Sequence, residues 1–235
     1  MKKLIIIPAF NESASIVRTV EEIRAQAPEF DYIVINDCST DSTGKLCHQR
    51  GFHVIDLPLN LGIGGAVQTG YRYARDRGYD MAVQVDGDGQ HDPMFLREMA
   101  RELERDQADM VIGSRFLEKK GFQSSAIRRV GIRYFTRLIR LATGQTITDP
   151  TSGLRMVGKR AIALFAVHYP EDYPEPESVT AVLKKGWKVK EIPVIMRERK
   201  GGVSSISAKR SVYYMIKVTL AILIEWIRKE DEDEY

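Results

Sequence analysis

Two aspartates separated by one glycine, Asp86 and Asp88, follow an apolar run in the stretch QVDGDGQHDP and are the residues best suited to chemistry. With the amide of Gln90 they offer oxygen ligands that Mg²⁺ and Mn²⁺ accept, and phosphate oxygens of a substrate can complete the coordination. A D-x-D pattern alone is also common in surface turns and helix caps. Its position at the end of a predicted strand favours a binding site, since open α/β sheets bind ligands at the carboxyl ends of their strands.

Polar loops follow three other apolar runs and bring further candidate ligands to the same edge of the predicted sheet. The loops are PAFNE at 8–12, NDCSTDST at 36–43 and NLGIGGA at 60–66. Glycines allow a ligand to approach the backbone closely, and amides at a helix start favour phosphate. Taken alone, each loop is typical of a cap or turn, and none forms the G-x-G-x-x-G motif of a dinucleotide-dependent dehydrogenase. The residues that could hold a nucleotide are Pro8, Asn11, Glu12, Asp37, Asp41, Gly62, Gly64 and Gly65.

The elements that must position these residues are short apolar, β-branched runs alternating with helix-like segments. The predicted strands are 4–7, 32–36, 53–57, 81–85 and 110–114, and the predicted helices between them are 13–26, 42–50, 64–76 and 93–106. Crossovers of this length return each strand parallel to its predecessor. We therefore predict an α/β fold with a doubly wound parallel sheet over the first 115 residues.

The second half of the chain has too few strands for a core of its own, so we expect it to be built onto the same sheet. Its predicted helices are 124–142, 158–167, 176–185 and 207–228, and its one predicted strand is 188–196. A length of 235 residues is compatible with one large domain or two small ones, and we favour one.

Composition is that of a soluble globular protein, with 43% hydrophobic and 29% charged residues. Cys38 and Cys47 lack the partners of a zinc site, and we expect reduced thiols. The N-terminal apolar run is too short for a signal peptide and predicts a buried first strand in a cytoplasmic protein. The most apolar segment, 218–224, falls short of the roughly 20 apolar residues that a membrane span needs.

Charge is unevenly distributed along a chain whose net charge is only +3. Residues 115–140 contain eight basic residues and one acidic residue, and the basic helix predicted there is interleaved with apolar side chains. This composition suits an anionic bilayer or lipid phosphates, although a packed helix with a solvated basic face gives the same pattern. The segment 211–229 is too apolar for a free surface helix, so we expect it to pack against a partner subunit, a membrane protein or a bilayer. Nucleic acid is not expected, because no recognised binding motif accompanies the modest charge.

The ordered motifs PAFNE, NDCSTDST, NLGIGGA, DGDGQHDP, IGSRF and TSGLR resemble the inverting family 2 glycosyltransferases of the GT-A fold, particularly the dolichyl- or polyprenyl-phosphate sugar transferases. The resemblance runs from Pro8 to about Ser205. It implies a Rossmann-like, mostly parallel sheet flanked by helices for a GT-A domain at 1–205. A C-terminal apolar helix for membrane or partner contact, with an acidic tail, is expected at 206–235.

The resemblance also implies roles for individual residues. Nucleotide contacts are expected from Pro8, Phe10, Glu12, Asp37, Gly62 and Asp86, and a Mg²⁺ or Mn²⁺ cofactor on Asp86, Asp88 and Gln90. Contacts with donor or acceptor phosphates are expected from Arg115, Arg155, Arg199, Ser204, Arg128 and Arg129. Asp149 matches an acid near the reacting carbon and forms the expected catalytic set with Asp88 and Arg115. Two positions depart from the usual motifs: Asn36 replaces an acid, and Ser205 replaces a lysine.

The implied function is metal-dependent, inverting transfer of a hexose or N-acetylhexosamine, with glucose or N-acetylglucosamine favoured, from a nucleotide sugar. A UDP-sugar is the favoured donor, and undecaprenyl or another polyprenyl phosphate is the expected acceptor. Small bacterial members of this kind decorate cell-wall or surface polysaccharides. We expect a cytoplasmic protein peripheral to the inner face of the cell membrane, a homo-oligomer, and a small integral-membrane protein as a possible partner.

Three alternatives remain open at this point. A glycosyltransferase could act directly on a glycan hydroxyl, which requires a general base; Asp149 is then the expected base, and Glu175 and Glu177 are further candidates. A phosphate acceptor is already largely ionised at neutral pH, since its second pKa is about 6, and needs no strong base. A sugar-nucleotide-binding protein could use the same pocket without turnover. A nucleotidyltransferase is disfavoured, because PAFNESAS lacks a glycine-rich loop with arginine and lysine.

Overall fold

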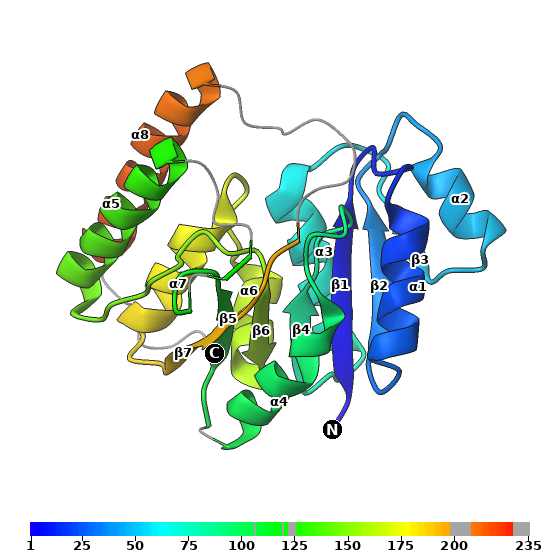
Figure 1. Ribbon diagram of the computed structural model, residues 1–235, viewed down its shortest axis with the longest axis horizontal. Helices are drawn as coiled ribbons and strands as arrows, with labels where there is room; N and C mark the ends of the chain where they lie inside the picture. Colours follow the sequence, from blue (N-terminus) through cyan, green and yellow to red (C-terminus); the bar gives the residue numbers. More distant parts are fainter. Residues whose placement is uncertain (106, 119, 122–125, 198–207, 228–235) are drawn as a thin grey trace.

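A mixed sheet with strand order β3-β2-β1-β4-β6-β5-β7 runs through the middle of the protein (Figure 1). The computed structural model describes residues 1–105, 107–118, 120–121, 126–197 and 208–227. The strands are β1 Lys3–Ala9, β2 Asp31–Asn36, β3 Val54–Asp56, β4 Met81–Gln84, β5 Met110–Ser114, β6 Arg155–Gly158 and β7 Val189–Pro193. All neighbours are parallel except β6, which runs antiparallel to both β4 and β5.

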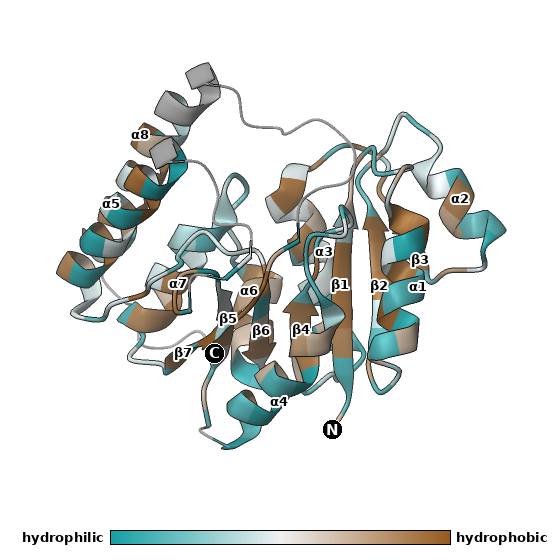
Figure 2. Cartoon of the chain, in the orientation of Figure 1, coloured by the Kyte–Doolittle hydropathy of each residue, from teal (hydrophilic) through white to brown (hydrophobic). Residues whose placement is uncertain are grey.

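Strand β1 accounts for the two helical layers, because its successive side chains point to opposite faces of the sheet. Leu4 and Ile6 belong to the apolar core on one face, and Ile5 and Ile7 to the core on the other. All four are at most 1% exposed. A continuous apolar run is what a parallel strand buried on both faces requires, and Figure 2 shows the central strands as mainly hydrophobic.

Helices cover both faces, and two of them form an outer pair. One face packs against α1 Ile16–Gln26, α2 Thr43–Gln49 and α4 Leu96–Arg105, which the 3₁₀ turn η1 Pro93–Phe95 precedes. The other packs against α3 Gly62–Asp76, α6 Lys159–Val167 and α7 Pro174–Lys184. Farther from the sheet, α5 Ala126–Thr143 and α8 Ala208–Ile227 pack on each other and on α7 (Figure 1).

The predicted α/β architecture is confirmed, and the second half of the chain is built onto the first sheet through β6 and β7. The mostly parallel sheet that the resemblance implies is also confirmed, and β6 is its one antiparallel strand. The sequence predicts no strand at residues 155–158, but β6 inserts between β4 and β5 and separates them. With only RMVG in β6, the apolar run is too short to show a strand pattern.

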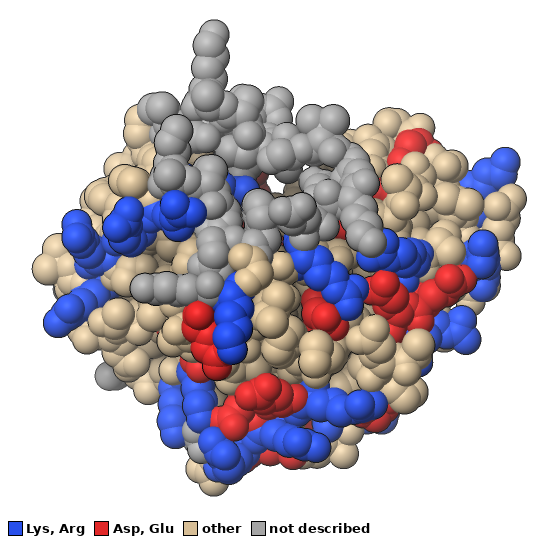
Figure 3. Space-filling model, viewed as in Figure 1, with Lys and Arg blue, Asp and Glu red and all other residues tan. Residues whose placement is uncertain are grey.

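The surface of α5 is strongly basic. Arg129, Arg133, Arg137 and Arg140 are exposed along it, and Figure 3 shows the corresponding row of basic side chains at the left edge of the molecule. No helix among the described residues has the length and apolarity to cross a membrane.

Candidate active site

A pocket of about 510 Å³ lies at the edge of the sheet where the parallel strands β1, β2, β4 and β5 end. Loops following these strands supply one part of its wall, as expected for an open α/β sheet. The loop at 149–154 joins them because β6 is antiparallel, so the residues that precede β6 meet the residues that follow its neighbours. Helices α5, α7 and α8 contribute Arg128, Glu175 and Tyr214 to the opposite wall.

The loops after β1 and β2 are tied together by side chains that do not line this pocket. The Asn11 side-chain oxygen accepts hydrogen bonds from the backbone N–H groups of Thr40 at 2.8 Å and Asp41 at 3.2 Å. Burial raises the pKa of Asp41, but hydrogen bonds from Ser13 and Thr43 outweigh this and lower it to about 2. Asn11 and Asp41 therefore stabilise the loops, and the nucleotide role considered for them does not match their position.

Asp37 lines the pocket and is only 3% exposed. Its carboxylate accepts the backbone N–H of Leu61 at 2.7 Å, and Asn60 donates to its carbonyl at 3.1 Å. Burial raises the pKa of Asp37, while the hydrogen bonds from Leu61 and Gly62 partly oppose the shift. Phe10 is 47% exposed, and its ring is suited to stacking on a base. The expected nucleotide contacts all line this pocket: Pro8, Phe10, Glu12, Asp37, Gly62 and Asp86.

The three expected metal ligands, Asp86, Asp88 and Gln90, line the same pocket. Asp88 accepts the backbone N–H of Gln90 at 3.0 Å, and Gln84 donates to Asp86 at 2.9 Å. A Cβ at Gly153 would lie 3.0 Å from an Asp86 carboxylate oxygen, so a glycine lets the loop pass close to this carboxylate. Among the described residues, no three His, Cys, Asp or Glu side chains are arranged to hold an ion. Two carboxylates and a carboxamide nevertheless fit Mg²⁺ or Mn²⁺ when phosphate oxygens share the coordination.

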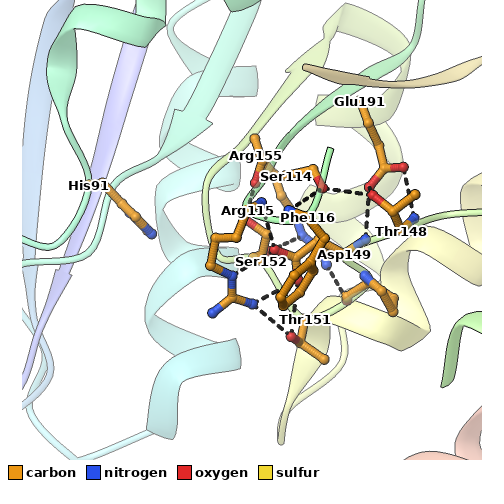
Figure 4. A network of polar contacts seen from close by, with 12 residues as sticks. His91, Ser114, Arg115, Phe116, Thr148, Asp149, Thr151, Ser152, Arg155 and Glu191 are labelled. Atoms are coloured by element: carbon orange, nitrogen blue, oxygen red, sulfur yellow. Dashed lines mark hydrogen bonds and ion pairs between the residues drawn. The ribbon is translucent and has the colours of Figure 1, made fainter. Parts of the chain in front are cut away.

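His91 lies beside this turn and was not identified from the sequence. It is 2% exposed, lines the pocket, and its Nδ1 accepts the backbone N–H of Asp86 at 3.1 Å. The proton of a neutral imidazole must then be on Nε2. Nε2 has no hydrogen-bond partner within the part of the chain that the structure describes, and it lies 3.8 Å from the Asp86 carboxylate. Figure 4 shows the ring across the site from Arg115. The only sequence feature that could have indicated His91 is its position at the end of the DGDGQHDP motif.

Arg197 holds the turn at residues 86–90 from outside the pocket. Its backbone N–H donates to the Gln90 carbonyl at 3.0 Å, and the Gln90 amide donates back to the Arg197 carbonyl at 3.2 Å. Its guanidinium pairs with Glu22 at 2.6 Å and Asp92 at 2.9 Å, which fastens the turn to α1. No local sequence pattern predicts this role for Arg197, because its acidic partners Glu22 and Asp92 are both distant from it in sequence.

Arg115 and Asp149 form a two-point ion pair between the end of β5 and the loop before β6 (Figure 4). Both guanidinium hydrogen bonds measure 2.7 Å, and the Arg115 backbone N–H adds a third at 3.1 Å. Thr151 donates a fourth at 3.2 Å, and Asp149 is fully buried. Arg115 lines the pocket whereas Asp149 does not. The position of Asp149 therefore favours orienting Arg115 over the expected contact with the reacting carbon.

A second carboxylate, Glu191 on β7, holds the loop that contains Thr148 and Asp149. It accepts hydrogen bonds from the Thr148 N–H at 2.8 Å, the Thr148 hydroxyl at 2.9 Å and the Asp149 N–H at 2.8 Å. Burial raises the pKa of Glu191, and these hydrogen bonds oppose the shift. Glu191 was not identified from the sequence, because its role depends on β7 lying beside β5.

Arg155 differs most from its expected role. It is 1% exposed, and its guanidinium donates to three backbone carbonyls and one hydroxyl. These acceptors belong to Pro150, Ser152, Glu175 and Ser178. Burial lowers the pKa of Arg155, partly opposed by the nearby Glu175. Arg155 does not line the pocket, so its position corrects the expected phosphate contact to a supporting role beneath the loop.

The remaining residues expected to contact phosphate have different positions. Arg128 lines the pocket, whereas Arg129 is exposed on α5 and does not. Arg199 and Ser204 lie outside the described residues.

Glu175, in the first turn of α7, is one of two carboxylates that line the pocket on the wall opposite Asp86, and Asp172 is the other. Burial raises the pKa of Glu175, Arg155 lowers it and Asp86 raises it further. Beside it, the rings of Tyr173 and Tyr214 meet edge to face with centroids 4.6 Å apart, and both line the pocket. Glu177, the other candidate base, does not line it. This wall therefore combines the carboxylates of Asp172 and Glu175, two aromatic rings and the basic side chain of Arg128.

Residues 4–165 match glycosyl transferase family 2. The chain is 33% identical over 216 residues to an undecaprenyl-phosphate mannosyltransferase of Micrococcus luteus, covering 88% of each protein. It is 29% identical to a UDP-N-acetylglucosamine–dolichyl-phosphate N-acetylglucosaminyltransferase of Methanococcus voltae, covering 81% of this chain and 83% of the relative. The fold resembles that of glucosyl-3-phosphoglycerate synthase of Mycobacterium tuberculosis, solved with Mn²⁺, UDP and glucosyl-3-phosphoglycerate. This likeness has a TM-score of 0.73 at 18% identity and covers 98% of this chain and 81% of the other.

Proposed function

The chain belongs to glycosyl transferase family 2 and is a glycosyltransferase, and from this membership we propose that it transfers a sugar from a nucleotide sugar to a polyprenyl phosphate. The observation that carries the proposal is the composition of the two pocket walls. One wall combines the nucleotide loops with Asp86, Asp88 and Gln90, and the other presents Arg128 beside aromatic rings. Arg115 also lines the pocket, and in this proposal it contacts the donor diphosphate.

In this proposal the acceptor phosphate oxygen attacks the anomeric carbon from the face opposite the diphosphate. The carbon–oxygen bond to the diphosphate breaks, the configuration inverts, and the nucleoside diphosphate leaves with the bonding electrons. When bound, the divalent cation supplies Lewis-acid stabilisation of the leaving group. Arg115, held in a fixed orientation by Asp149, adds positive charge at the same point. Arg128 provides charge for the acceptor phosphate.

We propose a UDP-sugar as the donor. Glucose or N-acetylglucosamine is the favoured sugar for transfer. Support comes from the UDP and Mn²⁺ bound by a structural neighbour and from the N-acetylglucosaminyl relative. The mannosyl relative makes mannose the competing sugar. The names of both relatives include a lipid phosphate acceptor, which supports the acceptor class.

Transfer to a glycan hydroxyl is the second candidate function, and one observation favours it. A hydroxyl acceptor requires a base, and Glu175 lines the pocket with a pKa that burial raises above its ordinary value. A phosphate acceptor requires no such group. The role of Glu175 therefore discriminates between the two acceptors.

The test is to incubate the protein with Mn²⁺ or Mg²⁺, undecaprenyl phosphate and, separately, UDP-glucose, UDP-N-acetylglucosamine and GDP-mannose. Mass spectrometry should detect one lipid-linked sugar, and EDTA should abolish it. Nucleotide binding without any lipid product would contradict the lipid acceptor and direct the assay to glycans.

Asp88→Asn separates an enzyme from a sugar-nucleotide-binding protein without turnover. For an enzyme, this change should abolish turnover while weakening nucleotide binding far less, because the lost carboxylate acts chiefly on charge that develops as the diphosphate leaves. Equal losses of turnover and binding would support the non-catalytic protein.

A further inference from the structure

Helix α8 presents a continuous apolar stripe to the surface. Its exposed side chains recur every three or four residues, which places them on one face of a helix. They are Tyr213, Ile216, Leu220, Ile224 and Ile227, each between 53% and 77% exposed. On the opposite face, Val218 and Ile222 are 2% and 0% exposed and pack into the core. We call these five exposed residues the α8 stripe.

Helix α5 widens this stripe into a patch. Val130, Tyr134 and Leu141 on α5 are 61%, 41% and 71% exposed. The Thr219 hydroxyl donates to the Tyr134 hydroxyl at 3.2 Å, which fixes the two helices side by side. A large exposed apolar patch built by two packed helices marks an interaction surface.

The charge beside the patch indicates what covers it. Helix α5 contains no acidic residue, and Arg133, Arg137 and Arg140 are exposed along it (Figure 3). A second copy of the chain would present the same patch across a two-fold axis, bringing basic side chains toward basic side chains. An anionic bilayer surface instead complements both the arginines and the apolar side chains.

The same two helices also form part of the active-site pocket. Arg128 of α5 and Tyr214 of α8 line the pocket. An ion pair joins Lys217 of α8 to Asp172, another residue of the pocket wall, and Tyr214 packs on Tyr173. The position of α8 therefore determines both the patch and the acceptor side of the pocket.

We propose that the α8 stripe, with Val130, Tyr134 and Leu141, docks on the surface of an anionic bilayer and holds the mouth of the pocket at the depth of lipid phosphates. The arginines of α5 lie among the headgroups. The inference rests on the proposed function for the identity of the acceptor. Docking itself requires neither a nucleotide sugar nor turnover, so it can be tested separately.

The first experiment is sedimentation of the full chain with protein-free vesicles of phosphatidylcholine, with and without phosphatidylglycerol. We expect binding to the anionic vesicles that weakens as salt is raised. The triple variant Ile216→Glu, Leu220→Glu, Ile224→Glu should bind at least about 100-fold more weakly, because three large apolar side chains no longer enter the interface. A control variant, Leu59→Glu with Met94→Glu, alters equally exposed apolar residues elsewhere and should change binding less than about twofold.

Charge is tested by Arg133→Gln, Arg137→Gln, Arg140→Gln, which should remove the preference for anionic vesicles while keeping the weaker binding to neutral ones. Thermal melts of every variant verify the fold. Unchanged vesicle binding by the triple glutamate variant would overturn the proposal. A dimer in light scattering that this variant dissociates would assign the patch to a second copy. Binding to native membranes but not to protein-free vesicles would assign it to a membrane protein.

A transferase assay without vesicles, using a short water-soluble polyprenyl phosphate, separates docking from catalysis. The triple glutamate variant should retain turnover of this soluble acceptor while losing turnover of undecaprenyl phosphate in vesicles. Docking without turnover of any lipid phosphate would count against the proposed function and leave the docking surface standing. Equal losses with soluble and vesicle-bound acceptors would overturn a docking role for the stripe.

Discussion

Asp149 accepts two hydrogen bonds of 2.7 Å from the guanidinium of Arg115 and has no exposed surface. Removing one partner of a buried ion pair leaves the other charge uncompensated, at a cost of about 3–5 kcal/mol. Asp149→Asn should therefore lower the free energy of unfolding by about 3 kcal/mol, near the lower limit because Arg115 borders the pocket. Urea unfolding at neutral pH measures this change.

The exposed pair of Arg97 and Glu29 provides a matched control, since it also has two-point geometry. Glu29→Gln should cost less than about 1 kcal/mol, because solvent screens exposed charges. Similar losses for Asp149→Asn and Glu29→Gln would contradict a special role for the buried pair. Asp149→Asn should also reduce kcat by at least about 100-fold if Arg115 must be held in its orientation for turnover.

His91 should increase the metal affinity of the expected site by orienting the backbone and carboxylate of Asp86. Its Nδ1 fixes the start of the turn, and its Nε2–H lies near the carboxylate expected to bind the cation. Groups that orient metal ligands typically contribute 10- to 100-fold to metal affinity. His91→Ala should weaken Mn²⁺ binding by about tenfold or more, measured by electron paramagnetic resonance without donor or acceptor.

His53 is exposed and does not line the pocket, so His53→Ala is the control and should leave Mn²⁺ affinity unchanged. His91→Asn keeps a side-chain oxygen that can accept an N–H, and partial recovery of affinity would support the positioning role. Wild-type affinity in His91→Ala would argue that the imidazole only fills space.

Asp41 should make stability depend on pH in the acid range. Its folded pKa is about 2, below its ordinary value of 3.8, because hydrogen bonds from Ser13 and Thr43 outweigh the effect of burial. The ionised carboxylate thus contributes stability that is fully present above about pH 4 and lost as pH falls toward 2. Asp41→Asn should destabilise the protein at pH 6, and its deficit should shrink as pH falls. A deficit independent of pH would rule out this linkage.

The position of the site could be predicted from the sequence better than the contacts within it. Polar motifs that follow successive parallel strands must lie at one edge of the sheet. The order of strands and loops along the chain therefore predicts that Asp37, Asp86 and Asp88 lie at the same edge. Which way Asp149 or Arg155 faces depends on partners in other elements. Arg155 lies in a strand that pairs with Gln84, far away in sequence, and this pairing left no local pattern.

Residues missed in the sequence share a physical reason. Glu191 and Arg197 act through hydrogen bonds to backbone groups that β7 and the chain beyond it bring into reach. A single polar residue in a short strand or loop has no periodicity to mark it. Their roles depend on tertiary contacts, which local patterns do not specify.

Glu175→Gln should identify the acceptor class. With a polyprenyl phosphate acceptor, kcat should fall by less than about tenfold, because the phosphate is already ionised and needs no base. With a hydroxyl acceptor, loss of the base should cost about 100- to 10,000-fold. Burial raises the pKa of Glu175. With a hydroxyl acceptor, the loss of activity at low pH should therefore begin at a higher pH than an ordinary glutamate would give.

The pH profile of Glu175→Gln completes this test. If the acid limb of kcat/KM near pH 6 belongs to the acceptor phosphate, whose second pKa is about 6, it should persist in the variant. An acid limb that instead reports Glu175 should disappear in the variant together with most of the activity. Glu177→Gln is the matched control, because Glu177 is on the same helix but does not line the pocket. A large loss in Glu177→Gln would indicate that these changes disturb α7 itself, and neither acceptor class could then be assigned from Glu175 alone.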